Sequence, residues 1–170
     1  FSVEGKEQKF VFNATQAVEN FDVALSSNNG ETITGAKKTI GLPGEFEISN
    51  ILLRGFRTEA GENTIFKAHA QKTSFVHFGN LIDIPKSETL KALGENIDVA
   101  FVIVSEKFDA KKAKTLIESV EPRLVLIGGD SSQFSALAGL MNVEMVEENP
   151  LKVTKEKLSD EITEIKILNV

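Results

Sequence analysis

Four side-chain types that commonly carry chemistry are absent or scarce in this sequence. It has no cysteine, no tryptophan and no tyrosine, and only two histidines in 170 residues. Without cysteine, the chain has no disulfide, no thiolate metal site and no cysteine nucleophile, a composition compatible with the reducing cytoplasm where we expect the protein. Two histidines supply little imidazole for a transition-metal site. All 12 aromatic residues are phenylalanines, so rings pack in the core without a polar handle.

The charge balance and the hydrophobic pattern exclude two further classes. With 19 basic and 25 acidic residues the net charge is −6, which argues against binding to nucleic acid through a basic face. No apolar run approaches the ~20 residues of a membrane helix, so we expect no membrane partner. The length predicts one domain, residues 1–170, with a core that buries roughly two-thirds of the unfolded surface.

Periodicity and turn residues predict a mixed order of strands and helices. Helices are expected over 87–94, capped by Ser87 and ended by Gly94, over 109–120, capped by Asp109, and over 132–140, with a further helical turn at 155–158. Strands are expected over 1–4, 10–13, 21–26, 44–48, 51–56, 64–70, 75–78, 97–104, 123–127, 143–146, 151–153 and 162–168.

Both histidines fall on one predicted hairpin. If Gln71 and Lys72 form its turn, Phe66 lies opposite His77, and His69 lies three residues further along the same strand. Side chains alternate along a strand, so the two histidines point to opposite faces and cannot share a metal ion. We therefore expect half-buried or exposed strand histidines rather than proton-transfer groups.

Four segments of the sequence, 43–48, 64–81, 97–104 and 121–127, resemble the metallo-β-lactamase superfamily, in particular its UlaG-like branch. The first reads Pro-Gly-Glu-Phe-Glu-Ile and the second ends in Phe-Gly-Asn-Leu. The resemblance implies an α/β (α+β) fold, a compact four-layer αβ/βα sandwich. In relatives, a strand ending in Gly-His precedes a residue like Phe1. The resemblance thus implies a missing first strand, and an uncovered edge beside the hairpin 1–13 that invites a second copy or a partner.

The resemblance also places the family's metal ligands on this chain. The matching positions are Asn28, Gly30, Thr32, Ile33, Asn80 and Gly129. None offers imidazole or carboxylate, so we expect no metal cofactor. The prediction is a non-catalytic binding or scaffold module with a protein partner or a homodimer, its small-molecule ligand unknown.

Three alternatives stay open from the sequence. The first is a UlaG-like, metal-dependent hydrolase of phosphodiesters or lactones, whose oxygen ligands would come from Asp22, Asp83 and Asp130. The second is a phosphate cradle in the Gly-Gly-Asp-Ser-Ser segment 128–132, although its glycine spacing matches neither the Rossmann nor the P-loop pattern. The third is a serine nucleophile at Ser131 or Ser132, for which the sequence places no histidine base.

Overall fold

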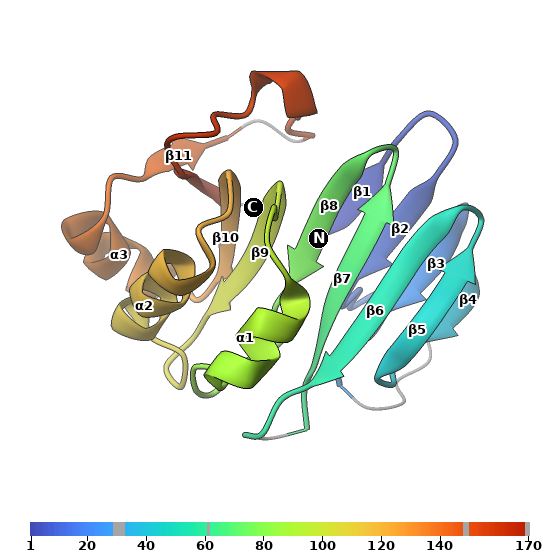
Figure 1. Ribbon diagram of the computed structural model, residues 1–170, viewed down its shortest axis with the longest axis horizontal. Coiled ribbons are helices and arrows are strands. Elements are labelled where there is room, and N and C mark those ends of the chain that lie inside the picture. Colours follow the sequence, from blue (N-terminus) through green and yellow to red (C-terminus); the bar gives the residue numbers. More distant parts are fainter. Residues whose placement is uncertain (29–32, 61, 148–149, 169–170) are drawn as a thin grey trace.

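The computed structural model describes residues 1–28, 33–60, 62–147 and 150–168. Its smaller sheet has the order β1-β2-β3-β4 (Figure 1). The strands are β1 (Ser2–Glu4), β2 (Lys9–Phe12), β3 (Phe21–Leu25) and β4 (Ala36–Ile40). The pair β1 and β2 is antiparallel, whereas β2, β3 and β4 run parallel.

The larger sheet has the order β11-β12-β10-β9-β8-β7-β6-β5. The strands are β5 (Gly44–Ile48), β6 (Ile51–Arg57), β7 (Thr64–Ala70), β8 (Thr73–His77), β9 (Val99–Val104), β10 (Leu124–Gly129), β11 (Glu144–Val146) and β12 (Glu164–Leu168). Strands β5 to β8 form an antiparallel meander, and β8, β9, β10, β12 and β11 are parallel neighbours. The carboxyl ends of these parallel strands therefore meet at one edge of the sheet.

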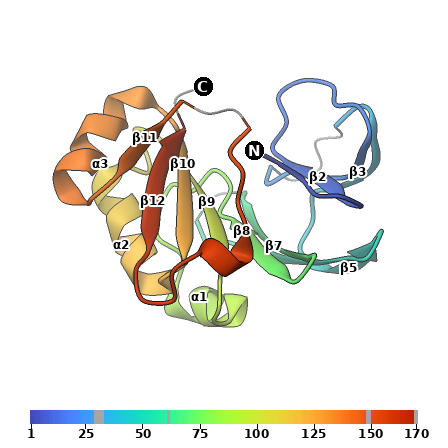
Figure 2. The same cartoon turned by 90° about the horizontal axis from the view of Figure 1, so that it is seen from above.

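The α-helices of the described residues cover one face of the larger sheet, and the smaller sheet lies over the other (Figures 1 and 2). They are α1 (Ser87–Leu93), α2 (Ala110–Val120) and α3 (Phe134–Leu140), with short 3-10 turns η1 (Ser131–Gln133) and η2 (Lys155–Lys157). The mixed αβ fold and its two facing sheets are confirmed, and the described residues show three of the four layers expected. None of the helices they contain is long and apolar enough to cross a membrane.

Two hydrophobic clusters hold these layers together. One lies between the helices and the larger sheet and includes Val102 and Leu116, and the other lies between the two sheets and includes Phe12 and Phe101. Strand β9 contributes to both, because its residues are apolar on either face, as expected for a strand covered on both sides.

Most predicted elements are present, and three details were wrong. Helix α2 begins at its predicted cap, where the Asp109 side chain accepts from Lys112 N at 3.0 Å. Helix α1 has Lys86 rather than Ser87 at its N-cap, with no side-chain capping bond. Strand β4 was not predicted, because two exposed lysines of an edge strand hide its pattern. Residues 151–153 form no strand; Leu151 packs instead against the core between the sheets.

Candidate functional site

The candidate site lies at the carboxyl ends of the parallel strands, the usual position of ligand sites in α/β sheets. Asn80 follows β8 and Gly129 ends β10. Asn28 comes from the smaller sheet, three residues after β3. The two sheets meet here because Thr64 N donates to Ser27 O at 2.9 Å and Asn28 forms an isolated bridge with Asn63.

Two of the six predicted ligand positions contact each other directly. Asn80 Nδ2 donates to Asn28 Oδ1 at 3.0 Å, although 52 residues separate them along the chain. Both side chains are exposed. Asn28 and Asn80, two of the positions that the resemblance places in a metal cluster, thus meet in space as a neutral amide pair.

A buried network of neutral polar groups supports this pair. The Asn63 side chain donates to Phe78 O at 3.0 Å and accepts from Asn80 N at 2.8 Å, while Ser27 N donates to Asn13 Oδ1 at 2.7 Å. Gly79 makes the bend at φ +72°, and a Cβ there would overlap Asn63 Oδ1. Sequence reasoning missed Asn63 and Asn13, and only their places beside strand ends could have indicated a role.

His77 belongs to the same network, but it faces the core between the sheets. Its side chain is fully buried, rather than half-buried or exposed as predicted, and stacks on the Phe12 ring at a centroid distance of 4.8 Å. Gly79 N donates to Nδ1 at 3.0 Å, so in the neutral ring Nε2 carries the proton. Burial lowers the pKa of His77 to about 3, so the ring is neutral at physiological pH. The exposed His69 points to the other face, as predicted.

The remaining ligand positions have other structural roles or lie outside the described residues. Ile33 is 8% exposed and packs with Val11 and Ala24. Gly129 has φ +109°, and a Cβ there would overlap Val104 O, so this backbone has no room for a histidine. Gly30 and Thr32 fall outside the residues that the structure describes.

The donor chemistry of the site does not fit a zinc or manganese ion. Such ions bind imidazole nitrogen, thiolate or carboxylate, whereas the described ligand positions offer two amides, a glycine and an isoleucine, and the His77 ring faces the core between the sheets. Within residues 1–28, 33–60, 62–147 and 150–168, no three His, Cys, Asp or Glu side chains form a group able to hold a metal ion.

The three aspartates considered for an oxygen-rich site have separate partners. Asp22 binds Lys37 at 2.7 Å, and this hydrogen bond is the main cause that lowers the pKa of its carboxyl. Asp83 lies 3.7 Å from Lys112. Asp130 accepts from Ser132 N at 2.9 Å, so its carboxylate already occupies an amide that a phosphate cradle would use.

Comparison with known proteins agrees with the fold. The sequence profile described as "Beta-lactamase superfamily domain" matches residues 16–127, and the chain belongs to this family. No curated protein sequence matches the chain.

Three solved structures share the architecture. The first is described as a putative Zn-dependent hydrolase of the metallo-β-lactamase superfamily from Thermotoga maritima, with TM-score 0.77 and 18% identity over 98% of this chain and 94% of that one. The second is the metallo-β-lactamase fold protein YhfI of Bacillus subtilis, with TM-score 0.60 and 6% identity over 98% and 87%. The third, a CmlA β-hydroxylase mutant, covers 74% of this chain and 43% of its own, with TM-score 0.54 and 8% identity. At these identities the likeness concerns the fold alone.

Proposed function

We propose that this chain is a non-catalytic member of the β-lactamase superfamily domain family and acts as a binding or scaffold module, expected in the cytoplasm. The observation that carries the proposal is the contact of Asn80 with Asn28, in which a neutral amide pair stands at the predicted ligand positions. Metal-dependent hydrolysis requires an ion that lowers the pKa of a bound water. Amide side chains do not hold such an ion in place of imidazole and carboxylate.

The backbone around the site supports the same proposal. At Gly129 the positive φ and the close Val104 carbonyl exclude a larger side chain, and Ile33 is packed in an apolar cluster. Recovering a ligand at either position would require rearrangement of the surrounding structure as well as a substitution. The backbone at Gly129 and the packing of Ile33, as well as the side-chain types, therefore support a site without metal.

The test is metal content measured together with activity. Protein is purified without chelator and dialysed against 10 µM zinc or manganese, roughly ten times the dissociation constant of a micromolar site. Its metal content is then measured by elemental mass spectrometry. We expect well below one equivalent per chain, and no hydrolysis of bis(p-nitrophenyl) phosphate or of a homoserine lactone. About one equivalent of metal, lost with an activity on adding chelator, would overturn the proposal.

The second candidate is a metal-dependent hydrolase of the UlaG-like type, acting on phosphodiesters or lactones. Its support is the fold shared with the Thermotoga maritima protein over 98% of this chain, since that protein is described as a putative Zn-dependent hydrolase. The same measurement separates the two functions, because only the hydrolase requires stoichiometric metal.

A further inference from the structure

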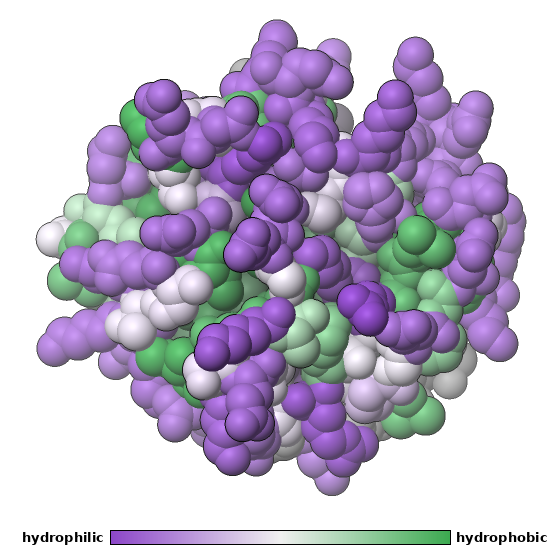
Figure 3. Space-filling model, viewed as in Figure 1, coloured by the Kyte–Doolittle hydropathy of each residue, from purple (hydrophilic) through white to green (hydrophobic). Residues whose placement is uncertain are grey.

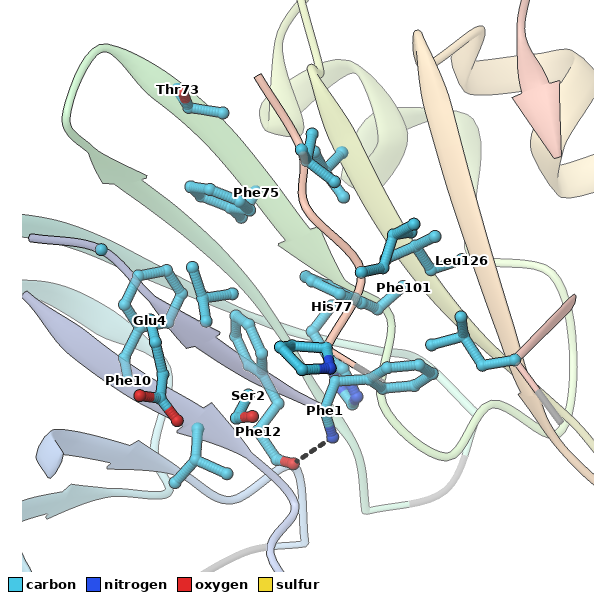
Figure 4. A pocket seen from close by; sticks show the side chains of 18 of the residues that line it. Phe1, Ser2, Glu4, Phe10, Phe12, Thr73, Phe75, His77, Phe101 and Leu126 are labelled. Carbon is cyan, nitrogen blue, oxygen red and sulfur yellow. Dashed lines mark hydrogen bonds between the residues drawn. The ribbon is translucent and has the colours of Figure 1, made fainter. Parts of the chain in front are cut away.

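An extended apolar surface lies inside the molecule, between the two sheets. The face seen in Figure 1 is mostly hydrophilic, with apolar side chains in separate patches (Figure 3). Between the sheets, by contrast, a cavity of about 1090 Å³ has an apolar wall (Figure 4). Phe101 of β9 and Leu126 of β10 belong to that wall and are 3% and 6% exposed. Residues 150–155, which we call the strap, line the same cavity and cross it beside these two side chains.

The strap is part of the connection from β11 to β12. These strands are parallel neighbours, so the chain has to return from the carboxyl end of one to the amino end of the other, a crossover that is commonly a helix. Here the return path lies on the inner face of the larger sheet, toward the smaller sheet (Figure 2). Its described part contains the 3-10 turn η2 and is otherwise irregular. The strap is therefore an irregular segment where a packed helix is usual.

Few interactions tie the strap to the two sheets. Among the described residues, no backbone hydrogen bond joins residues 150–155 to a strand. Leu151 packs half-buried against the core between the sheets, whereas Lys152, Val153 and Thr154 are exposed. Moving the strap therefore breaks none of the described hydrogen bonds that pair the strands. A segment with few buried contacts and no bonds to a strand opens at a smaller free energy than the whole fold.

One side chain fastens the strap at its carboxyl end. Lys155 Nζ donates to Asp98 Oδ2 at 2.9 Å and to Lys72 O at 2.8 Å. The buried Asp98 carboxylate also accepts from Ser74 N at 2.8 Å and from Arg123 at 3.1 Å. Release of Lys155 thus leaves Asp98 hydrogen-bonded, and the partly exposed ammonium group of Lys155 can be hydrated. This contact can open without leaving a buried charge unpaired.

We propose that the strap is a lid over the cavity, which opens while both sheets stay paired, and that Lys155 is the latch that holds it closed. Opening gives solutes access to the apolar wall formed by Phe101 and Leu126. The inference concerns access to the cavity and does not rest on the absence of metal. Metal content tests the proposed function and strap opening tests the lid, so either can fail alone.

The experiment uses introduced thiols, because the chain contains no cysteine of its own. Val99→Cys places a thiol on the cavity wall, and Val125→Cys places one on the helix side of the larger sheet. Both positions are at most 1% exposed, and the change is the same. Each folded variant is mixed with the thiol reagent dithiobis(nitrobenzoate), and the reaction rate is followed by absorbance. The free energy of unfolding of each variant, measured with urea, gives the rate that global unfolding alone would allow.

We expect the two thiols to differ in rate. The Val99→Cys thiol should react at least about tenfold faster than global unfolding allows, because opening of the strap exposes it, and more slowly than in the urea-unfolded chain. The Val125→Cys thiol should react only as fast as global unfolding allows, because the strap does not cover the helix side of the sheet.

The latch is tested by a second substitution in both thiol variants. Lys155→Met keeps the aliphatic stem and removes the ammonium group. We expect it to speed the reaction of the Val99→Cys thiol about tenfold, the effect of losing one hydrogen bond to a charged group. In Val125→Cys it should change the rate only as far as the free energy of unfolding changes. The control is Lys166→Met, which breaks the ion pair with Glu144 outside the cavity and should leave the Val99→Cys rate within about twofold.

Three outcomes would overturn the inference. A Val99→Cys thiol that reacts only as fast as global unfolding allows would make the strap a fixed wall. A thiol that reacts as fast as in the urea-unfolded chain would show that the cavity is open without any movement. An unchanged rate in Lys155→Met would show that Lys155 is not the latch. If Val99→Cys fails to fold, Leu126→Cys places a thiol on the same wall and decides between these outcomes.

Discussion

The two ends of the larger sheet contrast in the polar groups that they bury. At the amino ends of the parallel strands, Asp98 is 1% exposed and binds Ser74 N at 2.8 Å, Arg123 at 3.1 Å and Lys155 at 2.9 Å. At the carboxyl ends, the buried polar side chains are the neutral groups around Asn63 and His77. One end is an ion cluster, and the other is a network of amides and a neutral ring.

The buried charge of the larger sheet therefore does not lie at the end where a functional site is expected. In α/β sheets the carboxyl ends of the strands usually form the reactive end, yet here the buried carboxylate stands at the opposite end. Burial raises the pKa of Asp98, but the bonds from Ser74 N–H and Lys155 outweigh it, so the pKa lies below its usual value. Lys155 also donates to Lys72 O at 2.8 Å. The charge therefore ties the segment around Lys155, one wall of the cavity, to the sheet.

The largest effect is expected from neutralising the charged end. Asp98→Asn removes the carboxylate shared by Ser74 N, Arg123 and Lys155; because both cations are partly exposed and Arg123 keeps its pair with Asp160, we expect the free energy of unfolding to fall by about 3 kcal/mol. The control is Glu45→Gln, which breaks the exposed pair with Arg54 and is expected to change it by less than ~1 kcal/mol. Urea unfolding followed by circular dichroism measures both, and equal effects would contradict the role assigned to Asp98.

At the neutral end, the buried His77 ring should make the free energy of unfolding depend on pH. The pKa of His77 is about 3 in the fold and about 6.5 in the unfolded chain, so between these values the unfolded chain binds a proton that the fold excludes. The contribution of His77 to the free energy of unfolding is therefore fully present above pH ~6.5. It falls as the pH is lowered, by at most roughly 1.4 kcal/mol per pH unit. Urea titrations from pH 7 to about pH 5.5 stay above the range in which carboxyl groups such as Asp98 take up protons in the unfolded chain.

Two variants identify the histidine responsible. His77→Gln removes the titrating group and should flatten the pH dependence, whereas the exposed His69→Gln should leave the slope as in the wild type. If His69→Gln flattened the slope and His77→Gln did not, the neutral ring would not be the cause.

A smaller effect is expected from the bend that holds the amide network. Gly79→Ala places a Cβ against Asn63 Oδ1 at φ +72° and should lower the free energy of unfolding by about 1–3 kcal/mol. Gly139→Ala in α3 meets no atom within 4 Å and should raise it by about 0.5–1 kcal/mol. Thermal unfolding of both variants gives the comparison, and a neutral Gly79→Ala would show that the bend tolerates a side chain.

The two ends also differ in how far the sequence could predict them. The β7–β8 register followed from a two-residue turn and strand alternation, so Phe66 pairs with His77 as predicted. The pairing of Asn80 with Asn28 joins segments 52 residues apart, and the bond from Lys155 to Asp98 spans 57. Side-chain hydrogen bonds leave no periodic pattern, so neither network could be read from spacing. The family resemblance located only the positions on which ligands would fall.

The smallest change in stability is expected at the exposed amide pair. Asn80→Asp replaces the donor to Asn28 Oδ1 with a carboxylate oxygen, so one exposed hydrogen bond is lost and the free energy of unfolding falls by no more than about 1 kcal/mol. The variant brings a carboxylate to the neutral end without imidazole partners, and a single carboxylate leaves a bound ion mostly hydrated. We therefore expect 100 µM zinc to leave its midpoint of thermal unfolding unchanged. Asn80→Ser, which removes the amide without adding charge, is the matched control. If zinc raised the midpoint of thermal unfolding by several degrees in the aspartate variant alone, other groups near Asn80 would have to complete a metal site there.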